Sequence, residues 1–153
     1  MVFDAALKIS LLSRVMSDQK ETKIIEFPLH GNVQIGFIGV YENHPNLPFE
    51  VKRVFWTVQT PEEILRGRHA HRQTEQILIA LQGIIRVTTE SPDGRVEIFT
   101  LDHPSKGLYV PPNSWHTMQY HNNAIQLVLA STAYDEADYI RDYANYKSYY
   151  GGK

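Results

Sequence analysis

The sequence contains no cysteine, and its 153 residues carry a net charge of only −2. Without cysteine the chain has neither disulfides nor thiolate zinc sites, which is compatible with a reducing cytosol. The nearly balanced charge gives no reason to expect a nucleic-acid or membrane-surface partner. No apolar run approaches the about 20 residues that span a bilayer. We therefore expect a cytoplasmic protein that binds neither nucleic acid nor membranes.

The length of the chain fits one domain, which can bury most of its apolar surface without cross-links. Residues 7–16 are mildly apolar, but charges within them and the lack of a small-residue cleavage site argue against a signal peptide. Met16 precedes a polar stretch and is a candidate for the true start. We predict an N-terminal extension over residues 1–22 and a single domain over residues 23–153.

The middle of the chain is rich in short β-branched and aromatic runs, separated by Gly, Pro, Asn and Asp. A spacing of about 8–12 residues between such runs is typical of a β-sandwich or barrel. Gln82-Gly83 is predicted to form a hairpin between two strands, and residues 91–94 (Ser-Pro-Asp-Gly) to form a turn. The predicted strands are 23–27, 33–41, 51–57, 67–71, 76–82, 84–89, 96–101, 107–110, 117–120 and 125–130.

The end of the chain has a different pattern, and residues 135–147 are predicted to form a short helix. Acidic residues gather at its start, where they favour the helix dipole. Tyr139, Ile140, Tyr143 and Tyr146 recur at helical spacing and form one apolar face. We expect this helix to cover a sheet edge, with a lid over the mouth of a barrel as the alternative.

Residues 66–76 read Arg-Gly-Arg-His-Ala-His-Arg-Gln-Thr-Glu-Gln and carry the strongest chemical signal. On a β-strand His69 and His71 point to the same face, because side chains alternate across a strand. Glu75 follows four positions later. Taken alone, a pair of histidines with this spacing is weak evidence, and it could lie on a solvent face.

A second signal, Gly-Leu-Tyr-Val-Pro-Pro-Asn-Ser-Trp-His (107–116), strengthens the first. The two prolines are expected to fix the turn that aims His116. If the site holds a metal, His69, His71, Glu75 and His116 would suit Fe, Mn, Ni or Zn. If it does not, the imidazoles serve as general acids and bases, since histidine titrates near neutrality. Spacing alone leaves both alternatives open.

Arginine and aromatic residues near these signals are candidates for substrate binding. Arginine suits bidentate contacts with phosphate, so histidine and arginine in one cavity favour a phosphorylated substrate. With unbroken alternation, however, Arg66 and Arg68 would lie on the face opposite the histidines. Aromatic rings near His116 could stack on a base or sugar, or pack in the core. The substrate-binding candidates are Arg66, Arg72, Arg86, Tyr109, Trp115 and His116.

These blocks together resemble a specific family, the sugar nucleotide 3,4-ketoisomerases of the cupin superfamily, from about residue 24 to residue 149. These enzymes are the thymidine-diphosphate-4-oxo-6-deoxyglucose (dTDP-4-oxo-6-deoxyglucose) oxoisomerases of bacterial deoxysugar biosynthesis. The resemblance is carried by Val-Lys-Arg-Val-Phe-Trp (51–56), Arg-Gly-Arg-His-Ala-His-Arg (66–72), Glu-Gln-Ile-Leu (75–78), Lys-Gly-Leu-Tyr-Val-Pro-Pro (106–112), Trp-His (115–116), Val-Leu-Ala-Ser (128–131) and Tyr-Asp-Glu-Ala-Asp-Tyr-Ile-Arg (134–141).

The resemblance implies an all-β fold, a cupin jelly-roll β-barrel with a short C-terminal helix, in a homodimer with an exchanged N-terminal strand. It implies an isomerase without metal or cofactor, which moves the keto group of dTDP-4-oxo-6-deoxy-D-glucose from C4 to C3 through an enediol. His69 and His71 match the family's active-site histidines, while Arg66 and Arg72 are placed near the diphosphate and sugar. The expected output is a 3-amino sugar for a glycan such as lipopolysaccharide or an S-layer.

Three other functions compete with this interpretation. A related sugar nucleotide epimerase would also use a histidine base, but the Arg-Gly-x-His-Ala-His-Arg block argues against it. A metal-dependent cupin enzyme and a non-catalytic sugar-binding cupin are the other two. The sequence leaves open the configuration of the product at C4, the preferred nucleotide, and which of His69 and His71 is the base.

Overall fold

The structure, a computed structural model that describes residues 20–42 and 47–151, confirms the predicted all-β class. Among these residues no helix is long and apolar enough to cross a membrane. The elements are β1 (Lys23–Glu26), β2 (Leu29–Asn32), β3 (Gly36–Gly39), β4 (Arg53–Thr57), β5 (Arg66–His71), β6 (Gln76–Glu90), β7 (Val96–Leu101), β8 (Lys106–Val110), β9 (Trp115–Ala130), the 3₁₀ turn η1 (Glu136–Asp138), β10 (Tyr139–Ile140) and helix α2 (Tyr143–Tyr150).

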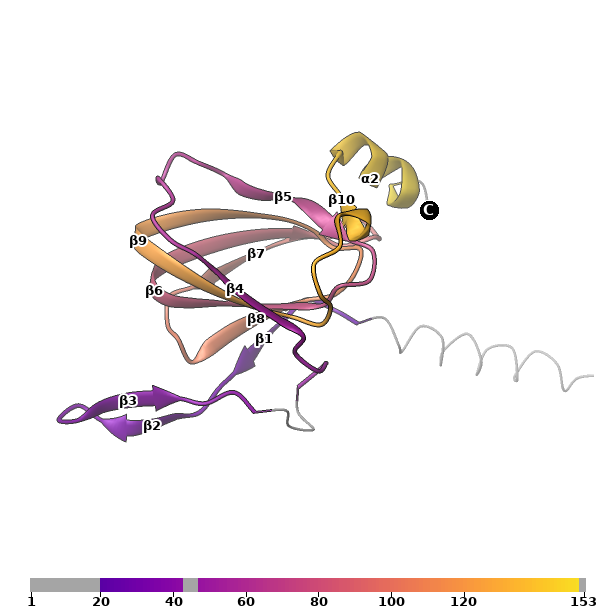
Figure 1. Cartoon of the computed structure of the whole chain (residues 1–153). Coiled ribbons are helices and arrows are strands. Elements are labelled where there is room, and N and C mark those ends of the chain that lie inside the picture. Colours follow the sequence, from indigo (N-terminus) through magenta and orange to yellow (C-terminus); the bar gives the residue numbers. More distant parts are fainter. Residues whose placement is uncertain (1–19, 43–46, 152–153) are drawn as a thin grey trace, which may run out of the picture.

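Two long antiparallel strands, β6 and β9, run through both layers of the fold (Figure 1). The first half of β6 and the second half of β9 pair with each other and with β8 and β4, and β1 extends this layer along β8. The other halves pair with each other and with β7 and β5, and β10 extends that layer along β5. Pairings among the described strands do not close a ring, so the sheet is wrapped around its core without a hydrogen-bonded seam.

The bend between the two layers replaces a predicted hairpin. The expectation that Gln82-Gly83 separates two strands is wrong, because β6 continues through it with two shifts in register against β9. Gly83 has φ +71°, and on the facing strand Asn122 and Asn123 have φ +57° and +52°. Left-handed backbone of this kind kinks a strand at a bulge as well as closing a turn. Likewise β9 is one strand where two were predicted.

The alternation of side chains along β6 explains how one strand serves two clusters. Leu78 and Ala80 point into the space between the layers, where they join the main core. Ile77 and Ile79 point the other way and pack with Tyr109. This outer face is covered by the N-terminal part of the chain, through partly buried side chains on both sides of the segment that the structure leaves undescribed: Ile25, Phe27, Tyr41, Leu47, Phe49 and Val51.

The β2–β3 hairpin stands apart from the eight-stranded sheet. Its strands pair only with each other among the described residues, and Figure 1 shows it projecting from the end of the molecule away from α2. Large apolar side chains on and beside it are exposed to solvent, with Val33 at 86% and Ile35 at 80%. The sequence indicated one strand over residues 33–41 at this place. Residues 1–19 of the predicted N-terminal extension lie outside the part of the chain that the structure describes.

The predicted helix over residues 135–147 is wrong as a single element, although a short C-terminal helix is present. Asp135 caps η1, the chain then extends as β10, and Asp142 caps α2 by accepting a hydrogen bond from the amide of Asn145 at 2.7 Å. In β10, Tyr139 pairs with His71 and its neighbour with Ala70. Pairing with β5 therefore overrides the helical spacing of the apolar residues.

Candidate active site

A cavity of about 110 Å³ lies between the two layers and reaches the histidines of β5 and β9. One wall comes from β4, the first half of β6 and the second half of β9. The other wall comes from β5 and the first half of β9, and Tyr139 of β10 completes it. The lining includes Arg66, Gly67, His69, His116, Met118, Tyr120, Gln76, Gln126, Phe55 and Thr57.

A β-bulge in β5 places Arg66 and His69 on the same wall. Arg66 pairs with Met118 and His69 with His116, so one extra residue is accommodated between them. Gly67 and Arg68 both have positive φ, +78° and +59°. A Cβ on Gly67 would lie 2.8 Å from the carbonyl oxygen of His116, which explains the glycine. The alternation is therefore broken here, and the bulge turns Arg66 towards the cavity.

Three histidine rings gather at this wall, with Tyr139 against two of them. Ring centroids of His69 lie 4.9 Å from His71 and 4.6 Å from His116, and those of His71 and His116 lie 6.2 Å apart. The Tyr139 centroid lies 5.0 Å from His69 and 4.3 Å from His71. The guanidinium of Arg141, paired with Glu136, lies 4.1 Å from the Tyr139 centroid and holds this ring in place.

Each histidine has an oxygen within hydrogen-bond distance of its Nδ1 atom. The partner is the carbonyl of Gly67 for His69, at 3.0 Å, and the carbonyl of Ser114 for His116, at 3.1 Å. For His71 the partner is a carboxylate oxygen of Asp138, at 3.0 Å. Since these oxygens only accept, a neutral ring carries its proton on Nδ1 and keeps a lone pair on Nε2. Nε2 of His71 is buried and has no partner among the described residues.

Burial keeps these rings neutral around neutral pH. Burial, together with the charge of a neighbouring histidine, lowers the pKa of His69 and of His71 to about 4 from the ordinary 6.5. Burial and the charge of His69 lower the pKa of His116 to about 3. Burial raises the pKa of Asp138, but hydrogen bonds from Thr74, the Gln73 amide and His71 outweigh it and lower the pKa. A neutral His71 therefore faces an ionised carboxylate.

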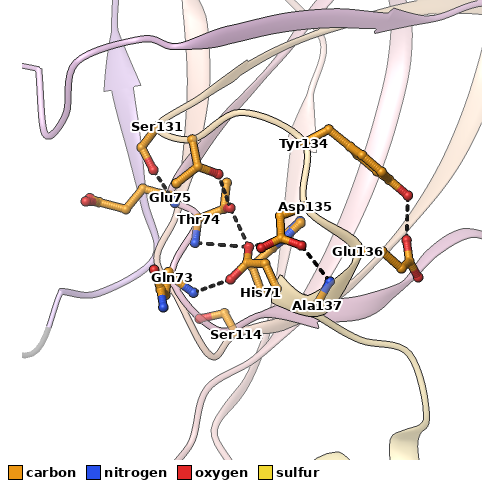
Figure 2. A network of polar contacts seen from close by, with 12 residues as sticks. His71, Gln73, Thr74, Glu75, Ser114, Ser131, Tyr134, Asp135, Glu136 and Ala137 are labelled. Carbon is orange, nitrogen blue, oxygen red and sulfur yellow. Dashed lines mark hydrogen bonds and ion pairs between the residues drawn. The ribbon is translucent and has the colours of Figure 1, made fainter.

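Asp138 accepts hydrogen bonds from His71, Gln73 and Thr74, which Figure 2 labels at the turn between β5 and β6. One carboxylate oxygen accepts from the amide of Gln73 at 2.7 Å. The other accepts from the amide and the hydroxyl of Thr74 and from His71. Thr74 in turn contacts the hydroxyl of Thr132 at 2.6 Å. Sequence reasoning missed Asp138 and Tyr139 as site residues, although the block 134–141 that contains them carried part of the family resemblance.

The structure brings together Arg66, His69, His71 and His116 of the predicted site residues. The side chain of Arg72 points outward, 5.5 Å from the ring centroid of Tyr149. Arg86 is exposed on the face of β6 opposite the buried Ile85 and Val87.

Tyr109 and Trp115 also lie away from the cavity. Tyr109 packs on the outer face of its layer, where its hydroxyl donates to Glu75 at 2.5 Å. Trp115 packs with Tyr146 of α2. Their predicted contact with substrate finds no support from the cavity of this chain, because strand alternation turns both rings outward.

The alternative set of four metal ligands is not assembled in the described chain. Glu75, which would be the carboxylate ligand, binds Tyr109 and Lys20 instead, and Figure 2 shows its side chain pointing away from His71. Within residues 20–42 and 47–151 no group of three or more His, Cys, Asp or Glu has the geometry to hold a metal ion.

Comparisons with known proteins give a family model and close relatives. Residues 20–151 match the family model described as WxcM-like, C-terminal (FdtA). A curated relative from Aneurinibacillus thermoaerophilus, named TDP-4-oxo-6-deoxy-alpha-D-glucose-3,4-oxoisomerase, is 42% identical over 131 residues, which cover 84% of this chain and 92% of the relative.

Solved structures of QdtA, a sugar 3,4-ketoisomerase from Thermoanaerobacterium thermosaccharolyticum, are also similar. Its complex with TDP has 34% identity and a TM-score of 0.81, covering 87% of this chain and 96% of that chain. A single-residue variant in complex with TDP-4-keto-6-deoxyglucose has 33% identity and a TM-score of 0.80, covering 86% and 95%.

Proposed function

Since this chain belongs to the WxcM-like, C-terminal (FdtA) family, we propose that it converts TDP-4-oxo-6-deoxyglucose into its 3-oxo isomer. The family resemblance seen in the sequence is thereby confirmed. The observation that carries the proposal is the arrangement of His69 and His71: two neutral rings with centroids 4.9 Å apart, of which His69 lines the cavity and His71 is buried beside it. Both keep a lone pair on Nε2, and their proton-bearing Nδ1 atoms are held by oxygens. Such rings can accept a proton and return it.

In the proposed reaction the carbonyl at C4 acidifies the proton at C3. Nε2 of His71 removes this proton, and the electron pair forms the C3–C4 double bond while charge moves to the oxygen at C4. The His71 imidazolium then returns the proton to C4. Asp138 lies against Nδ1 and stabilises that imidazolium, as an aspartate does in hydrolytic triads. Because Nε2 of His71 is buried, contact with the sugar requires the neighbouring rings to shift.

The hydroxyl proton travels the other way. His69 lines the cavity, and its Nε2 lone pair accepts the proton from the oxygen at C3 and passes it to the oxygen at C4. The carbonyl forms at C3, and C4 becomes a hydroxyl carbon, so atoms and electrons balance. Arg66, also in the lining, would face the developing negative charge or a phosphate. His116, fully buried, would hold the wall against which the sugar lies.

The protein is proposed to act as a homodimer through the β2–β3 hairpin. A two-stranded hairpin is marginal in water, and this one exposes Val33, Ile35 and Phe37. A second copy offers an apolar strip on β4, where Val54 and Trp56 are exposed. β1 pairs with β8 of its own chain, so among the described residues the hairpin is the N-terminal element that is available for exchange. The exchanged strand, the domain boundary at residue 23 and the cytoplasmic location stay predictions.

The reaction can be followed by proton NMR with TDP-4-oxo-6-deoxyglucose in D₂O. We expect the 3-oxo isomer to appear, with deuterium at C4 wherever the transferred proton exchanges with solvent. No isomer and no deuterium uptake would overturn the isomerase proposal. Deuterium exchange with inversion, but without migration of the keto group, would favour the epimerase. Stoichiometric Fe, Mn or Zn that is lost in a His116→Ala variant would favour the metal-dependent enzyme.

A further inference from the structure

Asp138 reaches His71 from a distant part of the chain, and four donors converge on its carboxylate. The Gln73 amide donates to one oxygen, while the other accepts from His71 Nδ1 and from the amide and hydroxyl of Thr74. The side chains of Asp138 and His71 are only 10% and 3% exposed. Four hydrogen bonds to one nearly buried carboxylate hold its side chain in place and favour its ionised form.

We propose that Asp138 is a positioning residue, which fixes His71 in the tautomer with its proton on Nδ1 and thereby presents the lone pair of Nε2. The inference rests on the proposed function, since the free lone pair matters as the base of the isomerisation. Without an acceptor at Nδ1, an imidazole in water divides its proton between both nitrogens. In this site the acceptor is a carboxylate, which also attracts the positive charge that forms on His71 during turnover.

The directions of the hydrogen bonds show why a carboxylate is needed. An asparagine has one oxygen and one NH₂ group, so at position 138 its NH₂ would face either the Gln73 amide or the donors Thr74 and His71. If the NH₂ faces His71, it donates to Nδ1 and moves the ring proton to Nε2. In that orientation the side-chain amide reverses the tautomer while keeping nearly the same shape. With its oxygen towards His71 it keeps the tautomer but lacks the negative charge, and its NH₂ opposes the Gln73 amide.

The contact between Thr74 and Thr132 fixes which hydroxyl donates and which accepts in this network. Because the Thr74 hydroxyl donates to Asp138, it must accept from the hydroxyl of Thr132, 2.6 Å away. Thr74 follows β5 and Thr132 follows β9, so the carboxylate is held at the ends of two core strands. This rigid support keeps the oxygen at 3.0 Å from Nδ1.

The test is ¹⁵N NMR of the histidine rings without substrate, combined with kinetics of Asp138→Asn. The His71 signals are assigned by their loss in His71→Asn. In the wild type we expect a protonated Nδ1 and an unprotonated Nε2 for His71. In Asp138→Asn we expect a shift towards Nε2–H and a kcat lower by about 10²-fold, within the range of general base catalysis, with KM nearly unchanged.

Asp142→Asn is the matched control, because asparagine caps a helix as well as aspartate and Asp142 lies outside the network. It should leave both the tautomer and kcat unchanged. An Nε2–H tautomer in the wild type overturns the proposal even if Asp138→Asn fails to fold. So does an Asp138→Asn variant that loses activity with its His71 tautomer unchanged. If the wild type shows the expected tautomer but forms no isomer, the proposed function fails while the positioning role stands.

Discussion

The histidine cavity and the β2–β3 hairpin differ in how completely their side chains are partnered within the chain. Around His71 the carboxylate of Asp138 meets four donors, and rings from β5, β9 and β10 pack against one another. At the other end of the molecule Val33, Ile35 and Phe37 are 86%, 80% and 58% exposed. The difference supports the proposal that the hairpin meets a second molecule, whereas the polar groups around His71 find their partners within the described chain.

The largest effect is expected at the histidines. His71→Asn and His69→Asn should each lower kcat by about 10²-fold or more, because general acid–base transfer contributes about 10²–10⁴-fold. Turnover of TDP-4-oxo-6-deoxyglucose measures the loss, and circular dichroism checks the fold. His103→Asn, on an exposed loop, is the matched control and should keep full activity. Near-normal rates in both active-site variants would refute their roles.

A smaller effect is expected from the arginine that the bulge turns inward. Arg66→Ala should raise KM by about tenfold or more, since a hydrogen bond to a charged group is worth about 1.5–3 kcal/mol. Arg86→Ala removes the same side chain from the outer face of β6 and should change neither KM nor kcat. Equal effects of the two substitutions would contradict a specific role of Arg66 in binding the substrate.

At the hairpin we expect Val33→Ser combined with Ile35→Ser to weaken dimerisation by about tenfold or more. Burying one such side chain contributes about 1.5–3 kcal/mol. Sedimentation velocity over a range of concentrations measures the dissociation. The control combines Val96→Ser with Ile98→Ser, which are both 58% exposed on β7 in the other layer. A wild type that is monomeric at all concentrations, or a control that dissociates equally, would contradict the role of the hairpin.

The last prediction concerns the pH dependence of stability, which we expect the histidine cavity to cause. The buried histidines have pKa values of about 4 in the fold and 6.5 in the open chain, so the unfolded chain binds more protons between these values. Stability should therefore be complete above pH 6.5 and decrease as pH falls towards 4. Calorimetry should show a falling Tm over this window, with a flatter dependence in His116→Gln. A Tm that rises on acidification would contradict the neutral cluster.

The sequence predicted most strands but not how they join. The alternation in residues 96–101 predicts β7 correctly, because that strand has one exposed face and a clear turn before it. Gly83, in contrast, has the local signature of a hairpin. Whether left-handed backbone closes a turn or bends a strand depends on the facing chain, here Asn122 and Asn123, some forty residues later. Local sequence does not contain that pairing.

The site, too, could be predicted only where local sequence determines it. The spacing of His69 and His71 and the aim of His116 follow from local alternation and a rigid turn. Asp138 falls within the predicted helix over residues 135–147 and was not predicted as a site residue. Its contact with His71 joins residues 67 positions apart, so no local pattern indicates it. Whether Tyr109 and Trp115 point into the cavity or away from it depends on which elements pack on each side of their strands. That packing is a property of the whole fold and cannot be inferred from the local sequence.

The long reach of Asp138 has a consequence for the newly made protein. Chains emerge from the ribosome N-terminus first, and the strands that form the main core precede residue 131, whereas β10 follows them. The barrel layers can thus pair before the segment with Asp138 and Tyr139 has been added. The core strands alone therefore do not make the site, which is complete only when residues 138–140 dock across β5.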